Sequence, residues 1–167
     1  MVGNTAAAEG NFGILIEETP DAPTSGGPDE MGYAWVSSLD DEGTPIDWMD
    51  ISTLGVDTGV HGDDVGANVE LPFTFPFYEN VYTSVNASSN GYLTFGTDMT
   101  DYSNTTLPDP GDFDPNDGIY PYWDDFTLGT SGTIFYYYDA DNDRAIFQWH
   151  EVPQLSGGTA PNTFQAL

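Results

Sequence analysis

Closely spaced aspartates are the residues of this chain with the clearest chemical potential. They gather in two short runs, residues 139–143 (DADND) and 112–118 (DFDPNDG). The acidic residues concerned are Asp139, Asp141, Asp143, Asp112, Asp114 and Asp117. Carboxylates at nearly alternate positions of a tight loop suit Ca²⁺, a hard cation with variable coordination. Neither run has Gly at the sixth position, so neither is an EF-hand loop. The alternative is that Asp and Asn simply form turns by bonding their own backbone.

Two adjacent acidic pairs, Asp63-Asp64 and Asp124-Asp125, are further candidates for the same oxygen chemistry. His61 precedes the first pair and would add a nitrogen ligand. A histidine on a surface loop is the simpler interpretation of that residue. Calcium is the only cofactor that these patterns indicate.

Aromatic residues supply a second kind of candidate site. Tyr120, Tyr122 and Trp123 lie close together in the sequence, and exposed rings stack on the faces of sugars. Core packing is the alternative, because alternate residues of a strand point inward and aromatic rings dominate core burial. Asn86 and Asn104 begin N-glycosylation sequons, which matter only in a host that glycosylates its surface proteins.

Composition excludes several classes of function. One basic residue stands against 28 acidic ones, giving a net charge of −27, whereas nucleic acids and anionic membranes require Lys and Arg to neutralise phosphate. The chain has no cysteine, so thiolate metal sites and Cys nucleophiles are absent. It also lacks the sequence motifs of serine hydrolases, zinc proteases and phosphate-binding loops. We therefore expect a non-catalytic protein.

The acid excess also indicates an environment. Like charges spread along a whole chain repel one another and weaken the compact state. Salt at 1 M shortens the Debye length to about 3 Å and screens most of that repulsion, and bound divalent cations would offset it as well. We expect a saline or calcium-rich setting outside the cell, with a very soluble secreted protein as the alternative.

The elements that position these residues are predicted to be strands throughout. Apolar residues alternate with polar ones and prolines over residues 69–77, as in a half-buried strand, and the two prolines favour a sheet edge or a bulge. Asn90-Gly91 is a strong hairpin signal. About ten strands at short spacing predict an all-β, antiparallel sandwich or jelly roll. The expected strands cover residues 12–16, 33–36, 46–51, 69–77, 85–95, 119–126, 133–138, 145–149 and 162–167.

Residues 1–32 differ from the rest of the chain. An apolar run containing Phe12, Ile14, Leu15 and Ile16 precedes a Pro- and Gly-rich stretch that is typical of a linker. We therefore separate an N-terminal strand and linker, 1–32, from a β-sandwich domain, 33–167. The apolar run would either fold back onto its own domain or insert into a neighbouring copy and build a filament.

Four sequence blocks carry a family resemblance. Residues 71–96 (LPFTFPFYENVYTSVNASSNGYLTFG), 114–126 (DPNDGIYPYWDDF), 132–149 (GTIFYYYDADNDRAIFQW) and 162–167 (NTFQAL) occur in that order. In this combination the chain resembles a nidogen-like extracellular module of secreted bacterial proteins. The resemblance implies a β-rich, non-catalytic module that occurs beside secreted peptidases, adhesins and other surface proteins.

These observations predict a secreted or cell-surface β-sandwich module for adhesion, spacing or assembly, stabilised by calcium or salt. Its partners would be other extracellular proteins, neighbouring copies or surface glycans. Two alternatives remain open: a filament or surface-layer subunit that polymerises through its N-terminal strand, and a carbohydrate-binding module.

Overall fold

The computed structural model describes residues 25–38, 45, 47–109, 116–156 and 160–167. Its contacts divide the chain into two units, Met1–Asp47 and Trp48–Leu167. In the first unit, β1 (Ser25–Gly26) pairs antiparallel with β2 (Trp35–Val36). Residues 25 and 26 thus belong to a strand, although their composition is that of a linker.

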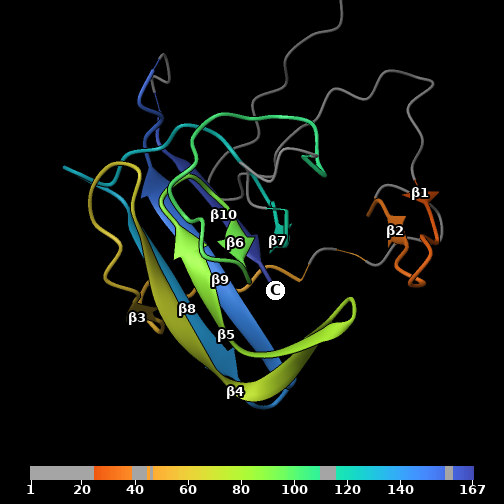
Figure 1. The fold of residues 1–167 in the computed structure, drawn as a ribbon. Helices are drawn as coiled ribbons and strands as arrows, with labels where there is room; N and C mark the ends of the chain where they lie inside the picture. Colours follow the sequence, from red (N-terminus) through yellow and green to blue (C-terminus); the bar gives the residue numbers. More distant parts are fainter. Residues whose placement is uncertain (1–24, 39–44, 46, 110–115, 157–159) are drawn as a thin grey trace, which may run out of the picture. The chain divides into compact units, whose positions relative to one another are not determined.

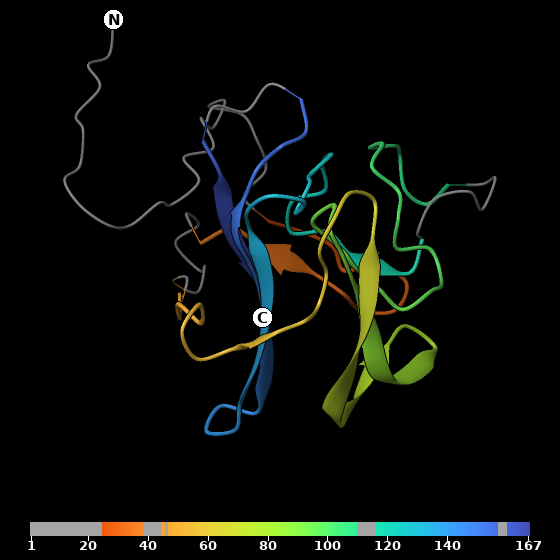
Figure 2. The same cartoon turned by 90° about the vertical axis from the view of Figure 1, so that its left-hand side faces the viewer.

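The described residues of the second unit form two four-stranded antiparallel sheets. One has the order β10-β9-β8-β3 and the other β4-β5-β6-β7 (Figure 1). Seen edge-on, the sheets form two layers (Figure 2). The strands are β3 (Val56–Asp57), β4 (Gly66–Phe77), β5 (Asn80–Ser88), β6 (Leu93–Thr94), β7 (Gly118–Ile119), β8 (Thr133–Asp139), β9 (Arg144–Val152) and β10 (Asn162–Ala166).

The predicted all-β, antiparallel sandwich is confirmed. The described residues contain no helix, and so none that could cross a membrane. Three expected strands match β8, β9 and β10 within a few residues. The prediction for residues 12–16 lies outside the described residues.

The alternating segment forms β4, as predicted from its period of two. Its odd-numbered residues are half-buried on the inner face, and its even-numbered residues from Asn68 to Pro76 are exposed. β4 is the edge strand of its sheet, and its ladder with β5 is irregular between Glu70 and Phe75. Pro72 and Pro76 therefore stand on an edge, where a missing N–H donor does least harm.

The Asn90-Gly91 signal also marks a real turn. The chain reverses between β5 and β6, and the backbone N–H of Ser88 donates to Tyr92 O over 2.9 Å. Gly91 has φ +81°, the left-handed region that favours glycine. A Cβ atom at Gly91 would overlap the carbonyl oxygen of Tyr122, so the turn packs directly against the segment after β7.

Two strand predictions are wrong. Residues 119–126 form only the end of β7 and then leave the sheet, because Pro121 cannot donate and the later residues bond the Asn90-Gly91 turn instead. Residues 47–51, the described part of the expected strand 46–51, are not a strand either. There the Ile51 N–H donates to the side-chain oxygen of Gln148 over 2.9 Å, which replaces a strand partner.

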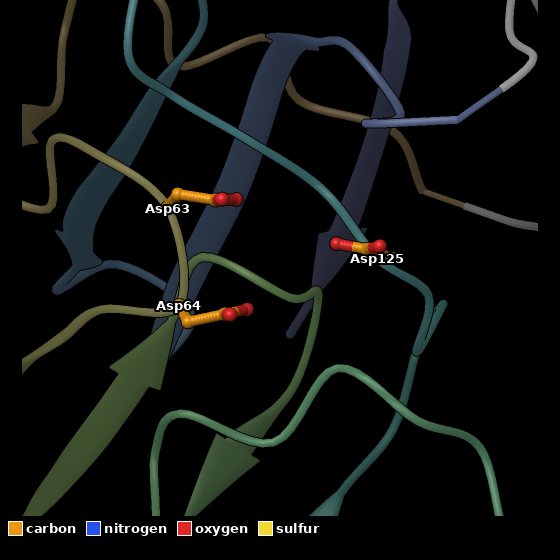
Figure 3. Close-up of side chains that lie close together, drawn as sticks. All are labelled: Asp63, Asp64 and Asp125. Atoms are coloured by element: carbon orange, nitrogen blue, oxygen red, sulfur yellow. The ribbon is translucent and has the colours of Figure 1, made fainter.

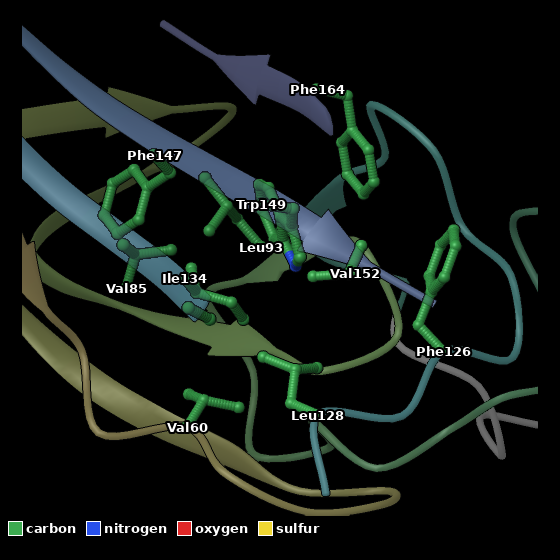
Figure 4. Close-up of a cluster of buried hydrophobic side chains, with 11 residues drawn as sticks. Val60, Val85, Leu93, Phe126, Leu128, Ile134, Phe147, Trp149, Val152 and Phe164 are labelled. Carbon is green, nitrogen blue, oxygen red and sulfur yellow. The ribbon is translucent and has the colours of Figure 1, made fainter. Parts of the chain in front are cut away.

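The core lies between the two sheets of the second unit (Figure 4). Trp149 and Phe126 are completely buried, and Phe164 stacks on Trp149 with ring centroids 5.1 Å apart. Burial of one such side chain contributes about 1.5–3 kcal/mol. Trp149 Nε1 also donates to the backbone oxygen of Ser88 over 2.9 Å, which joins β9 to the end of β5 in the opposite sheet.

Candidate metal centre

Three carboxylates meet at one end of the sandwich: those of Asp63, Asp64 and Asp125 (Figure 3). One oxygen of each lies within 4.8 Å of the others. Two oxygens that bind the same Ca²⁺ at about 2.4 Å cannot be farther apart than about 4.8 Å. Among the described residues, no other group of three or more Asp, Glu or His side chains meets this condition.

Backbone pairing brings the two halves of this cluster together across more than sixty positions of sequence. Asp63 forms an antiparallel bridge with Thr127, and the Leu128 N–H donates to Gly62 O over 2.7 Å. Asp64 has φ +50°, a conformation that Asp tolerates better than most residues. The segment before β4 and the segment after β7 are therefore held side by side, and their carboxylates converge.

The buried side chain of Asn90 holds the acidic cluster in place through hydrogen bonds. Its Nδ2 donates to Asp64 Oδ1 over 2.9 Å, and its Oδ1 accepts from the Phe126 N–H over 3.0 Å. Its backbone oxygen accepts from the Asp124 N–H over 3.2 Å. One fully buried residue of the β5–β6 turn thus holds both carboxylate-bearing segments.

Asp124 and Asp125 do not act as a pair. The Asp124 carboxylate turns to the neighbouring Gln154, whose Nε2 donates to it, and it also accepts from the Asp125 N–H over 2.8 Å. Of the two, Asp125 is the one whose carboxylate joins those of Asp63 and Asp64, and Figure 3 shows these three side chains. The two predicted acidic pairs are brought together, and they contribute three carboxylates.

Repulsion between these carboxylates favours the binding of a cation. Burial, followed by the charges of Asp64, Asp63 and Asp124, raises the pKa of Asp125 above its ordinary value. Two unit charges about 5 Å apart repel by roughly 1 kcal/mol in water and about 3 kcal/mol at an effective dielectric constant of 20. A divalent cation would convert this repulsion into attraction.

The predicted loop at residues 139–143 is arranged differently. The Asp139 carboxylate is buried and accepts from Arg144 Nε and Asn142 Nδ2, over 2.9 and 2.8 Å. The hydrogen bond from Asn142 and then the guanidinium of Arg144 lower the pKa of Asp139. Asp143 accepts from the Tyr138 hydroxyl over 2.7 Å, and Asp141 is exposed. These three carboxylates do not form a group with the mutual spacing described above.

Of the second predicted run, Asp117 is exposed next to β7, whereas Asp112 and Asp114 lie outside the described residues. The apolar residues proposed for assembly, Phe12, Ile14, Leu15 and Ile16, also lie outside them. Calcium at either run and assembly through residues 12–16 stay predictions.

The three predicted sugar-binding rings are half-buried and pack against different neighbours. Tyr122 packs into the core against Phe126 and Phe164, with ring centroids 5.2 and 5.4 Å apart. Tyr120 and Trp123 pack on each other at 5.3 Å. This arrangement favours the packing interpretation for Tyr122, and sugar binding stays a prediction.

The sequon asparagines and His61 also have defined surroundings. Asn86 Nδ2 donates to Gly96 O over 2.7 Å, so the nitrogen that a glycan would occupy is engaged within the sheet region. Asn104 is exposed, and its Nδ2 donates to Trp123 O. His61 Nε2 lies 3.2 Å from Asp57 Oδ2 on the surface.

Sequence reasoning missed the role of Asn90. It marked Asn90 only as part of a turn, whereas its side chain organises the acidic cluster. No local pattern joins residues 63–64 to residue 125, because their proximity arises from pairing between segments far apart in the chain. The two acidic doublets were the only available signal.

Comparison with protein families gives one match. The family model described as NIDO related, for nidogen-related domains, matches residues 43–167. Comparisons with curated proteins and with solved structures give no significant match.

Proposed function

The chain belongs to the nidogen-related family, a family of extracellular β modules without enzymatic activity, and from this we propose that it serves adhesion, spacing or assembly outside the cell, with Ca²⁺ as a structural stabiliser. The cation would bind Asp63, Asp64 and Asp125. The mechanism is mechanical support and binding, and it requires no chemical step.

The convergence of these three carboxylates is the observation that carries the proposal. They come from two segments that are joined directly by a few backbone hydrogen bonds and indirectly through the side chain of Asn90. Carboxylate oxygens are the ligands that Ca²⁺ prefers, and the ion usually completes its shell with backbone oxygens and water. A cation here would fasten the start of β4 to the segment that follows β7 and so close one end of the sandwich.

Thermal unfolding of the full chain with Ca²⁺ or with chelator tests this role. A ligand that binds only the folded state at 100 times its Kd stabilises by about 2.7 kcal/mol. We therefore expect Tm to rise with Ca²⁺ in the wild type and in Asp141→Asn, and to respond little in Asp125→Asn. Ionic strength is held constant with Na⁺, so that general screening does not contribute to the difference.

The Asp141 variant is a matched control, because it removes the same charge from the loop at residues 139–143. A calcium response that survives in Asp125→Asn but disappears in Asp141→Asn would assign the ion to that loop. A wild type whose Tm is indifferent to Ca²⁺ at constant ionic strength would refute the calcium proposal altogether.

A further inference from the structure

A groove of about 550 Å³ lies beside the tip of the β4–β5 hairpin. Four aromatic rings line it, and so do two exposed acidic residues, Glu79 and Asp117. The rings are those of Phe77, Tyr78, Tyr82 and Tyr120. The groove is separate from the acidic cluster, with which it shares no residue.

The hairpin tip has a sequence that folding alone does not explain. Phe77 pairs with Asn80, so the loop between β4 and β5 consists of only Tyr78 and Glu79. Tyr78 has φ +50°, although Gly, Asn and Asp are the usual residues for positive φ in such a loop. Tyr78 is 45% exposed. A bulky, partly exposed residue held in a disfavoured backbone conformation is typical of a functional position.

Other aromatic rings pack against Tyr78 and its neighbours. Tyr78 packs edge-on against Phe77, with ring centroids 4.9 Å apart and an interplanar angle of 89°. Phe95 then contacts both Phe77, at 4.8 Å, and Tyr82, at 4.5 Å. Three of the four rings that line the groove, those of Phe77, Tyr78 and Tyr82, are therefore part of a packed aromatic cluster, which fixes their orientation before any ligand arrives.

The charges of the residues that line the groove indicate which kind of ligand it would bind. Arg144, the only Lys or Arg in the sequence, is not among the residues that line it. Two carboxylates at the rings favour a cation, and the net charge of −27 repels anionic ligands. Among protein cations, the Arg guanidinium is planar, stacks on aromatic faces and also pairs with carboxylates.

We propose that the groove lined by Tyr78, Tyr82 and Glu79 binds an arginine side chain in an exposed segment of a partner protein. The proposal names the partner chemistry for the adhesive role above and rests on that role. It does not depend on calcium, because the acidic cluster and the groove are built from different residues.

Titration calorimetry of the full chain with a short capped peptide tests the inference. The probe is a six-residue peptide with two arginines separated by glycines, and its control replaces both arginines with citrulline, a neutral isostere. Measurements in 0.15 M and 1 M salt separate diffuse attraction, which 1 M salt screens, from contact in the groove. We expect the arginine peptide to bind at both salt concentrations. The citrulline peptide should show no measurable binding at either.

Two matched pairs of variants locate the contact. Tyr78→Gly should weaken binding roughly three- to tenfold while Tm changes little, since glycine accepts the positive φ and this offsets the lost contact with Phe77. Tyr102→Ala, which removes a ring of 51% exposure outside the groove, should leave affinity unchanged. Glu79→Gln should weaken binding, and Glu70→Gln, an equal change of charge on the exposed face of β4, should not.

Several results would overturn the proposal. These are absence of arginine-peptide binding to the wild type, equal binding of the citrulline peptide, and equal effects of Glu79→Gln and Glu70→Gln. Binding of a neutral oligosaccharide that is lost in Tyr78→Gly, without arginine binding, would identify the groove as a glycan site instead. In each case the calcium response of Tm is unaffected, so the two proposals fail separately.

Discussion

Asn90 and Asp64 are joined by a 2.9 Å hydrogen bond that connects a buried turn to an acidic surface cluster. The same amide accepts from the Phe126 N–H, so removing it leaves a buried backbone donor without its partner. We expect Asn90→Ala to lower the free energy of unfolding by about 2–3 kcal/mol, measured by urea denaturation. Asn68→Ala, on the exposed face of β4, should change it by less than about 1 kcal/mol. Equal effects of the two substitutions would contradict the central role of Asn90.

Asp125 should make stability depend on pH when calcium is chelated. Its raised pKa means that the folded state holds a proton more tightly than the unfolded state does. Its contribution is therefore fully present below the pKa of the unfolded chain and is lost as pH rises through the folded pKa. In chelator, Asp125→Asn should be more stable than the wild type at neutral pH, and the difference should shrink toward acid pH. A difference of the opposite sign, measured by urea denaturation across this range, would exclude repulsion within the cluster.

Tyr92 should produce a second, alkaline transition. Burial is the main reason that the pKa of Tyr92 rises to about 12, and its hydroxyl accepts from the Asp101 N–H over 3.1 Å. Unfolding lowers this pKa to the ordinary value near 10. The folded state should thus lose stability as pH rises from about 10 to about 12. Tyr92→Phe lacks the group that ionises, and denaturation curves over this range should show a weaker pH dependence for it than for the wild type.

Alanine substitutions at Gly91 and Gly59 should distinguish the cost of steric overlap from the cost of backbone strain. Both have positive φ, +81° and +82°, but a Cβ at Gly91 meets the Tyr122 carbonyl, whereas a Cβ at Gly59 meets nothing within 4 Å. Gly59→Ala should cost about 1 kcal/mol from strain alone. Gly91→Ala should cost at least about 3 kcal/mol or prevent folding, because the turn must move away from residue 122. Similar Tm values for the two variants would show that the turn is looser than this packing implies.

Local patterns predicted the parts of the fold that depend on local physics. The alternation at residues 69–77 identified β4 because a half-buried strand requires it, and Asn90-Gly91 identified the turn between β5 and β6. The segment 119–126 was predicted wrongly, since its aromatic residues indicated a strand while Pro121 and the contacts with residues 90 and 91 took it out of the sheet.

The acidic cluster shows where such reasoning stops. Both doublets are visible in the sequence, but Asp125 faces Asp64 because of the long-range bridge between Asp63 and Thr127 and the hydrogen bonds of Asn90, while Asp124 turns to Gln154. At residues 139–143 the spacing of carboxylates favoured calcium. Spacing alone could not reveal that Arg144, the only Lys or Arg in the chain, would pair with Asp139.

The prolines of β4 have a consequence for how copies of this protein meet. An outer strand with free N–H and C=O groups is a template on which another chain can add, and salt that screens a charge of −27 removes the repulsion that keeps copies apart. Pro72 and Pro76 interrupt that template on the edge of the β4 sheet. Addition of a strand from a crowded copy is thereby disfavoured along this edge, and association at this edge would rest on side chains instead of shared backbone.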